Sequence, residues 1–363
     1  MSGWRLANDS VSVGINPQGG QLGPVRFRAA SGWLEPMHKA PWLAELGAVK
    51  EPMLQNLQGD FFCAPFGASD LLRGETRDHG LTANGEWCEL EVTSDRILLA
   101  AEAEVSGATV TKEVFLKSGH PVIYQVHRFA GGEGSLPIGH HAMLRAPESD
   151  YLNLSFAPYS WAGTPPRPLE PDPANGRSRL RYPQRIRDLA EVRTANGERA
   201  DLTRFPVLED CEELAMLVTD RGEAVAWSAA VAFKSRWIWF ALRPNNVLRN
   251  TVLWLSNGGR YYPPFSHRHR RVIGIEETTS YFHLGHRASL EPNELNQVGY
   301  PTAVDLEPDG VLSSRYAFGA VTAPPGFDRV ERVRVEPGRV VMSDPFARTV
   351  EVPFDDGFFH EGD

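Results

Sequence analysis

The sequence predicts an all-β protein, and three observations support that prediction. Apolar and aromatic residues alternate with polar ones in short runs, clusters of turn residues separate these runs, and 33 Gly and 28 Pro occur among the 363 residues. A two-residue period places successive side chains on opposite faces of a strand. Because most of the gaps have hairpin length, we expect large antiparallel sheets.

The candidate strands fall into two groups. The first group predicts an antiparallel meander, and its runs are 87–92, 96–105, 108–116, 121–129 and 136–144. The second group has the same character, and its runs are 213–219, 224–233, 236–243, 250–256, 271–282 and 315–322. Between them, residues 159–183 are rich in Pro and Gly, which predicts a long connection of the kind that often borders a site, and residues 184–205 contribute at most one short helix.

The domain organisation follows from the uniform character of these runs. We expect residues 1–325 to form one β-sandwich domain and residues 326–363 to add a C-terminal β-hairpin packed on the same domain. No fixed-period repeat is present, which argues against a propeller or a solenoid.

Composition excludes several classes of protein. The hydrophobic share is 42%, no long uncharged apolar run is present, and the net charge is -9, so neither a membrane protein nor a nucleic-acid-binding protein is expected. The first ten residues lack the pattern of a secretory signal, and Cys63, Cys88 and Cys211 show no CxxC spacing. These features favour a reduced, cytoplasmic protein without a structural metal.

Histidines stand at two places where chemistry could occur. His79 lies in "RDHGLTANGEW", where Asn84-Gly85 predicts a tight turn with positive φ, so His79 belongs either to the solvated arm of a hairpin or to the rim of a site. His140 and His141 are adjacent in "LPIGHHAML". Neighbours on a strand face opposite ways, so only one of the two can face a given cleft, and either could instead be a structural core histidine.

Acidic and basic candidates lie later in the chain. Glu276 and Glu277 end the apolar run "VIGIEE", where a carboxylate is costly to bury without a partner, and again only one of them can face the cleft. The run "SHRHRR", which includes Arg268, is either a solvated hairpin arm or an anion-binding patch. His283 and His286 form an HxxH pair without a recognisable third ligand, so no metal site is predicted.

Aromatic residues near loops make a sugar a natural ligand, since their faces stack on pyranose C–H surfaces. Core packing explains most such residues, so this observation is weak by itself. The residues concerned are Trp87, Trp161, Trp254, Tyr261 and Tyr262.

These motifs together resemble those of the aldose 1-epimerases, or galactose mutarotases, and the related hexose-6-phosphate epimerases. "NPQGGQLGPVRF", "GDFFCAPFG", "DHGLTANGEW", "LPIGHHAML" and "GIEET" are similar to that superfamily's segments and occur in its order over roughly residues 10 to 320. The resemblance implies a galactose mutarotase-like β-supersandwich with an open cleft. It also implies an isomerase that interconverts the anomers of a free sugar, neutral or anionic, without any cofactor.

The resemblance also implies roles for particular residues. Glu276 would be the base, His141 the acid, and His79 a second histidine that orients the sugar; Glu277 and His140 are the register alternatives. The family usually places an arginine in the sugar site, whereas this chain has Ala83 where one branch shows it. The candidate substrate-binding residues are Arg73, Arg77, Asn84, Trp87, His140, Trp254 and Arg268.

Two other interpretations stay open at this point. The chain could be a carbohydrate-binding or regulatory protein without turnover, or an isomerase or lyase that acts on acidic sugars. In each case the expected partner is a small-molecule sugar, with no nucleic acid and no membrane, and the chain is a monomer or a homodimer.

Overall fold

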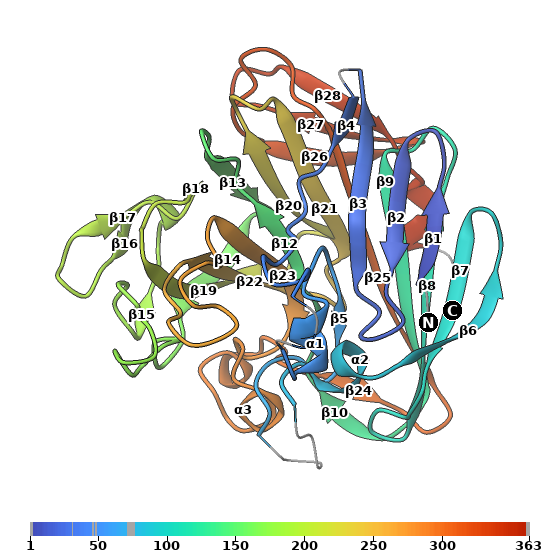
Figure 1. The fold of residues 1–363 in the computed structure, drawn as a ribbon, viewed down its shortest axis with the longest axis horizontal. Helices are drawn as coiled ribbons and strands as arrows, with labels where there is room; N and C mark the ends of the chain where they lie inside the picture. Colours follow the sequence, from blue (N-terminus) through green and yellow to red (C-terminus); the bar gives the residue numbers. More distant parts are fainter. Residues whose placement is uncertain (1–2, 31, 46, 48, 71–76, 361–363) are drawn as a thin grey trace.

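The computed structural model describes residues 3–30, 32–45, 47, 49–70 and 77–360. Strands dominate this part of the chain, and its three α-helices, α1 (Pro52–Gln55), α2 (Gly80–Asn84) and α3 (His286–Leu290), have five residues at most. None of these helices is long enough to cross a membrane. The prediction of an all-β fold is confirmed (Figure 1).

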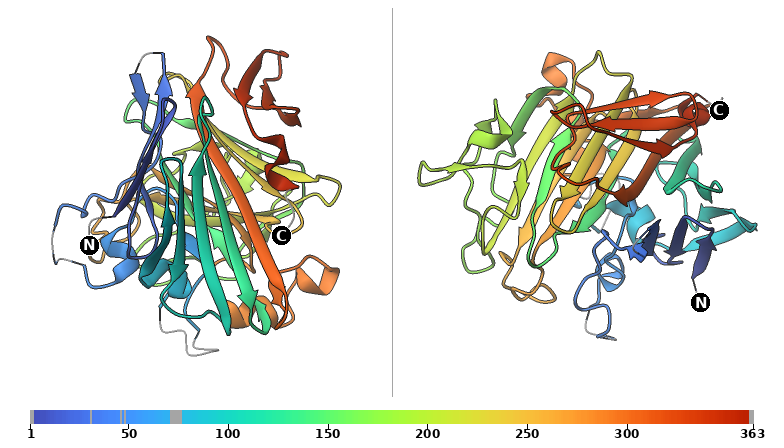
Figure 2. Two further views of the ribbon diagram at one scale, coloured as in Figure 1. Left: turned by 90° about the vertical axis from the view of Figure 1, so that its right-hand side faces the viewer. Right: turned by 90° about the horizontal axis from the view of Figure 1, so that it is seen from above.

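Two large antiparallel sheets form the body of the molecule (Figures 1 and 2). The eight-stranded sheet runs in the order β15 (Gln184–Arg185), β14 (Tyr159–Thr164), β19 (Cys211–Thr219), β22 (Asn250–Asn257), β23 (Val272–Thr279), β11 (Ile138–His140) and β5 (Phe62–Cys63), and β12 (Ala142–Arg145) also pairs with β23. The nine-stranded sheet runs in the order β18 (Arg204–Phe205), β13 (Leu152–Phe156), β20 (Val225–Ala232), β21 (Trp237–Pro244), β25 (Val311–Thr322), β9 (Val122–Gly131), β8 (Ala108–Leu116), β7 (Arg96–Ala101) and β6 (Trp87–Val92).

The main core lies between the two sheets. Leu253 and Ile275 of the eight-stranded sheet belong to one buried cluster with Phe129 and Phe318 of the nine-stranded sheet. Neighbours of these residues, such as Val252 and Trp254 on β22 and Ala317 on β25, belong to other clusters, as the two-residue period requires. Each large sheet is thus covered on both faces, and the face of the eight-stranded sheet away from the main core is called the outer face below.

Smaller sheets and turns complete the fold. A four-stranded sheet contains β1 (Trp4–Ala7), β2 (Val11–Ile15), β3 (Leu22–Ala29) and β4 (Gly32–Leu34). Two strand pairs are β10 (Gly134–Leu136) with β24 (Val304–Leu306) and β16 (Val192–Arg193) with β17 (Arg199–Ala200). Short 3₁₀ turns span Leu189–Glu191, Asn296–Val298 and Asp356–Phe359, and the first of these is the only helical turn described within residues 184–205.

The C-terminal extension contains one strand more than the sequence predicts. Its three-stranded antiparallel sheet consists of β26 (Arg332–Glu336), β27 (Arg339–Ser343) and β28 (Thr349–Pro353). Val340, Met342 and Val352 join a buried cluster with Tyr124 and Phe240, which lie on the face of the nine-stranded sheet away from the main core. The extension therefore covers apolar surface that this sheet would otherwise expose.

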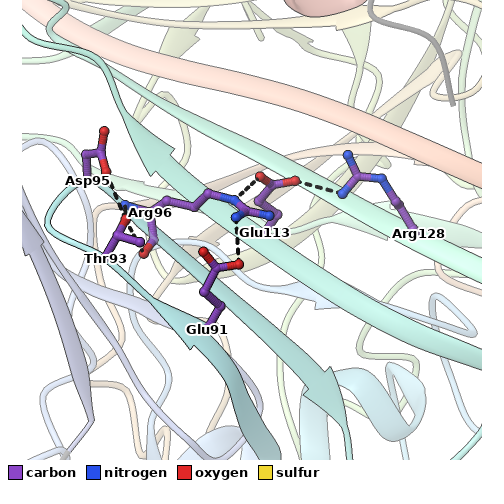
Figure 3. A network of polar contacts seen from close by, with 6 residues as sticks. All are labelled: Glu91, Thr93, Asp95, Arg96, Glu113 and Arg128. Carbon is purple, nitrogen blue, oxygen red and sulfur yellow. Dashed lines mark hydrogen bonds and ion pairs between the residues drawn. The ribbon is translucent and has the colours of Figure 1, made fainter.

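A charged network lies on the solvent side of the meander (Figure 3). The Glu113 carboxylate on β8 accepts from Arg96 on β7 at 2.5 Å and from Arg128 on β9 at 2.7 Å, and Arg96 also pairs with Glu91 at 2.9 Å. Partly exposed pairs of this kind are each worth about 1 kcal/mol or less. Their joint effect is to support the register of four neighbouring strands, β6 to β9.

The prediction of a tight turn at Asn84-Gly85 is wrong. Residues 80–84 form α2, and Gly85 follows it with an extended backbone at φ -87°. The Asn84 amide donates to the Asp78 and Gly80 carbonyls, which closes a helical turn instead of a hairpin loop. Positive φ occurs at the other end of the helix, at His79 and Gly80.

Candidate active site

A cavity of about 380 Å³ lies over the outer face of the eight-stranded sheet. This volume is within the range of small-molecule sites. Strands of the sheet contribute its floor, and α1 with the residue before it, the segment before α2 and the segment after β22 contribute to its walls. The lining residues that carry polar or aromatic groups are Glu51, Phe61, Asp78, His79, His141, Trp254, Arg260, Tyr262, Phe265, Glu276 and His283.

His141 and Glu276 meet at this floor. Ala142 on β12 pairs with Ile275 on the antiparallel strand β23. His141, just before Ala142, therefore lies beside Glu276, just after Ile275. His141 Nε2 and Glu276 Oε1 are 3.3 Å apart. Gly274, two residues before Glu276 on the same face, leaves room for the carboxylate, because a Cβ there would lie 2.6 Å from Glu276 Oε1.

His79 approaches the same pair from the segment before α2. Its ring centroid is 5.2 Å from that of His141, with the rings at 80°. The Gly67 N–H donates to His79 Nδ1 at 3.4 Å, so the neutral ring carries its proton on Nε2. The left-handed backbone of His79, at φ 63°, is uncommon for a residue with a side chain, and such conformations cluster at functional sites.

Burial shifts the protonation of all three groups toward their neutral forms. It raises the pKa of the Glu276 carboxyl well above its ordinary value, and the Arg260 charge opposes this rise. It lowers the pKa of His141 well below the usual value, an effect to which the charges of His79 and Arg260 add. It also lowers the pKa of His79 to about 4. Burial therefore favours a protonated Glu276 beside neutral imidazoles at neutral pH.

The neighbouring residues His140 and Glu277 face the main core. His140 Nδ1 lies 3.0 Å from Asp60 Oδ2, and its ring stacks on Tyr316. Glu277 pairs with the buried Arg243 at 2.6 Å. The structure thus places His141 and Glu276 in the cavity and their register alternatives behind the sheet.

Of the two tryptophans proposed for substrate binding, one lines the cavity. Trp254 on β22 is held by a 2.8 Å hydrogen bond from Nε1 to Glu212 Oε2. Trp87 is buried in the main core, where its Nε1 donates to the Thr82 carbonyl at 3.0 Å. Asn84 does not line the cavity either, since its amide is used within α2 and its position borders an adjacent hollow.

The arginines proposed from the sequence do not reach the cavity in the described structure. Arg268 pairs with Glu45 at the surface, and Arg270 in the same basic run pairs with Asp210 at 2.6 Å. Arg77 borders the adjacent hollow. Arg73 lies outside the described residues.

Sequence reasoning did not connect Arg260, Glu170 or His283 with the cavity. Arg260 follows β22 and lines the cavity, where its Nε donates to Glu170 Oε1 at 2.7 Å. Glu170 belongs to the connection 159–183, whose length was the one available signal for it. His283 also lines the cavity, whereas His286 Nε2 contacts the Ser135 carbonyl, so the two histidines of the HxxH pair serve different places.

Comparison with known proteins agrees with this architecture. No protein-family model matches the sequence, and no curated protein is significantly similar to it in sequence. Among solved structures, a galactose mutarotase related enzyme from Lactobacillus acidophilus superimposes with a TM-score of 0.55 at 11% identity, over 89% of this chain and 99% of that chain.

Two further structures match in the same way. A "putative aldose 1-epimerase" from Escherichia coli K12 gives a TM-score of 0.57 at 12% identity, over 87% of this chain and 98% of that chain. Another "putative aldose 1-epimerase", from Klebsiella pneumoniae, gives a TM-score of 0.52 at 13% identity, over 87% of this chain and 78% of that chain. At these identities the likeness concerns the fold, and it confirms the predicted galactose mutarotase-like β-supersandwich.

Proposed function

We propose that the chain is an aldose 1-epimerase-like isomerase, which interconverts the anomers of a free sugar by general acid-base ring opening. The observation that carries this proposal is the His141–Glu276 pair, with 3.3 Å between Nε2 and Oε1, on the floor of an aromatic-walled cavity. The hydroxyl at C1 and the ring oxygen are bonded to the same carbon. Two proton-transfer groups in contact with each other suit two such oxygens.

The reaction moves two protons. A base removes the proton of the C1 hydroxyl while an acid protonates the ring oxygen, so the bond between C1 and the ring oxygen breaks and C1 becomes a carbonyl. Rotation about C1–C2 exposes the other carbonyl face, and closure returns both protons. The pair must therefore hold one proton between its two members at the start.

Which member holds that proton decides the roles in ring opening. We assign Glu276 as base and His141 as acid, which requires the shared proton to be on His141. Burial by itself favours the proton on Glu276, so in this assignment the proton crosses the 3.3 Å contact between the two groups before ring opening. His79, neutral and with its proton on Nε2, donates a hydrogen bond toward the sugar near its ring oxygen.

The test of this proposal is the equilibration of freshly dissolved single anomers. Polarimetry over a panel of aldoses and aldose phosphates should show acceleration for at least one sugar. If none equilibrates faster than in buffer, the isomerase proposal is wrong even though the fold stands. Binding without acceleration, with an affinity that Glu276→Gln leaves unchanged, would instead identify a sugar-binding protein.

The proposal includes a cellular setting. We place the protein in the cytoplasm as a monomer or a homodimer, consistent with three free cysteines and with the absence of any disulfide among the described residues. The reaction as written uses only the side chains of this chain and the sugar.

A further inference from the structure

Arg260 is held in one position by contacts on several sides. Its guanidinium lies over the rings of Phe265 and Trp254, at 4.6 Å and 5.4 Å from their centroids. Its Nε donates to Glu170 Oε1 at 2.7 Å, and the Tyr262 hydroxyl donates to the same oxygen at 2.9 Å. A side chain packed and paired in this way loses little further freedom when a ligand binds.

The far end of this guanidinium is available to a ligand. Within the part of the chain that the structure describes, neither terminal amino group of Arg260 has a protein acceptor, and the residue lines the cavity. Arg260 lies over Trp254, whose ring centroid is 5.6 Å from that of His141, so Arg260 lies close to the proposed catalytic pair. A sugar that contacts the pair would therefore also contact Arg260.

The charge of Arg260 is already balanced. The Glu170 carboxylate, 8% exposed, forms the ion pair, and Gly176 leaves the space for it, since a Cβ there would lie 2.6 Å from Glu170 Cγ. Asp78 and Glu51 also line the cavity and add negative charge. An acidic sugar would thus meet two hydrogen-bond donors but no net positive charge.

We propose that the Arg260–Glu170 pair sets the charge selectivity of this cavity. Arg260 donates hydrogen bonds from its two terminal amino groups to adjacent hydroxyl oxygens of an uncharged sugar. Glu170 holds Arg260 in place and excludes the acidic counterpart of that sugar. The inference rests on the proposed function only in taking a sugar as the ligand. It makes Glu170, on the connection 159–183, a specificity-determining residue rather than a catalytic one.

The variant that tests this inference is Glu170→Gln. Glutamine keeps the oxygen that accepts from Arg260 Nε and from the Tyr262 hydroxyl, while it removes the balancing charge. Two unit charges several ångströms apart at an effective dielectric constant of about 20 interact strongly enough to change a binding constant by about tenfold or more. We therefore expect the affinity ratio of glucose to glucuronate, and of galactose to galacturonate, to fall by about tenfold or more in the variant.

Binding is measured by calorimetry, separately from anomer exchange, so the two proposals fail independently. Wild type should bind the neutral sugar of each pair more tightly than the acidic one. Arg260→Gln should lower the affinity for neutral sugars by about tenfold or more. The control Arg268→Gln should change neither this affinity nor the ratio of neutral to acidic sugar. The inference is overturned if wild type binds acidic sugars as tightly as neutral ones. It is also overturned if the affinity ratio is unchanged in Glu170→Gln, or if the protein binds no sugar at all. Selective binding without anomer exchange would overturn the proposed function alone.

Discussion

Glu276→Gln separates the proposed chemical role of this carboxyl from its structural one. Glutamine has the same shape and still contacts His141, but it cannot exchange a proton. General acid-base groups contribute roughly 10²–10⁴-fold to a rate, so we expect anomer exchange to slow by this factor, or about 3–5 kcal/mol of transition-state stabilisation.

The same substitution should make the folded protein more stable at neutral pH. The free carboxyl has an ordinary pKa of 4.5, and burial raises the pKa of Glu276 well above it. Between these two pKa values the folded state binds more protons than the unfolded state, so the stability of the wild type falls as pH rises, and the loss persists above the folded pKa. Glutamine lacks this titration, so the variant should gain relative to wild type above about pH 4.5, by about 1.4 kcal/mol for each pKa unit of the rise.

The measurement is urea unfolding of both proteins at pH 5 and pH 8, alongside exchange rates. Glu277→Gln is the matched control on the next residue, because it leaves the buried Arg243 without its counter-charge and should cost roughly 3–5 kcal/mol at pH 8. A Glu276→Gln protein that unfolds more easily than wild type at pH 8, or that retains full exchange activity, would refute this reasoning.

Three further predictions concern other parts of the molecule. His79→Gln should raise KM by about tenfold and lower kcat by less, because a neutral donor that orients the sugar is lost. Equal effects on KM and kcat would contradict that role. His38→Gln should reduce the loss of stability in acid, because burial lowers the pKa of His38 to about 3 while the unfolded state gains this proton below about pH 6.5. Between these pH values the wild type loses about 1.4 kcal/mol of stability for each pH unit through this group, so parallel acid-unfolding curves for the two proteins would argue against the prediction. Met342→Ala should reduce the free energy of unfolding by about 2–5 kcal/mol, since its side chain is buried under the C-terminal sheet, and a loss below 1 kcal/mol would show that the extension packs loosely.

The strands could be predicted because burial imposes a simple period on them. The run at 108–116 coincides with β8, where buried residues alternate with more exposed ones. The run at 87–92 coincides with β6, although Trp87 is the one buried residue of that strand. The sequence predicts one strand over 136–144, whereas Leu136 ends β10 and the rest of the run is divided into β11 and β12 at His141. That break has no counterpart in hydrophobicity, because the residues on both sides of it are buried.

The choice between the neighbouring residues Glu276 and Glu277 required the tertiary structure. Alternation shows that Glu276 and Glu277 face opposite ways, but both are buried, so hydrophobicity cannot tell the cavity face from the core face. The structure separates them by their partners, since Glu277 has the buried cation Arg243 and Glu276 has His141.

Arg260 and Glu170 could not have been found from local pattern. They lie 90 residues apart in two loops, and loop side chains follow no hydrophobic period. Arg268 was the more visible candidate because of the basic run around it, and the structure shows that side chain paired with Glu45 at the surface.

Saturation transfer between the α and β anomeric protons of a sugar in NMR tests the central claim most directly. With wild type, exchange between the two signals should be accelerated for a sugar that the protein binds, and Glu276→Gln and His141→Gln should each abolish the acceleration while binding persists. Sugar binding with no acceleration by the wild type, or undiminished acceleration in both variants, would contradict the account.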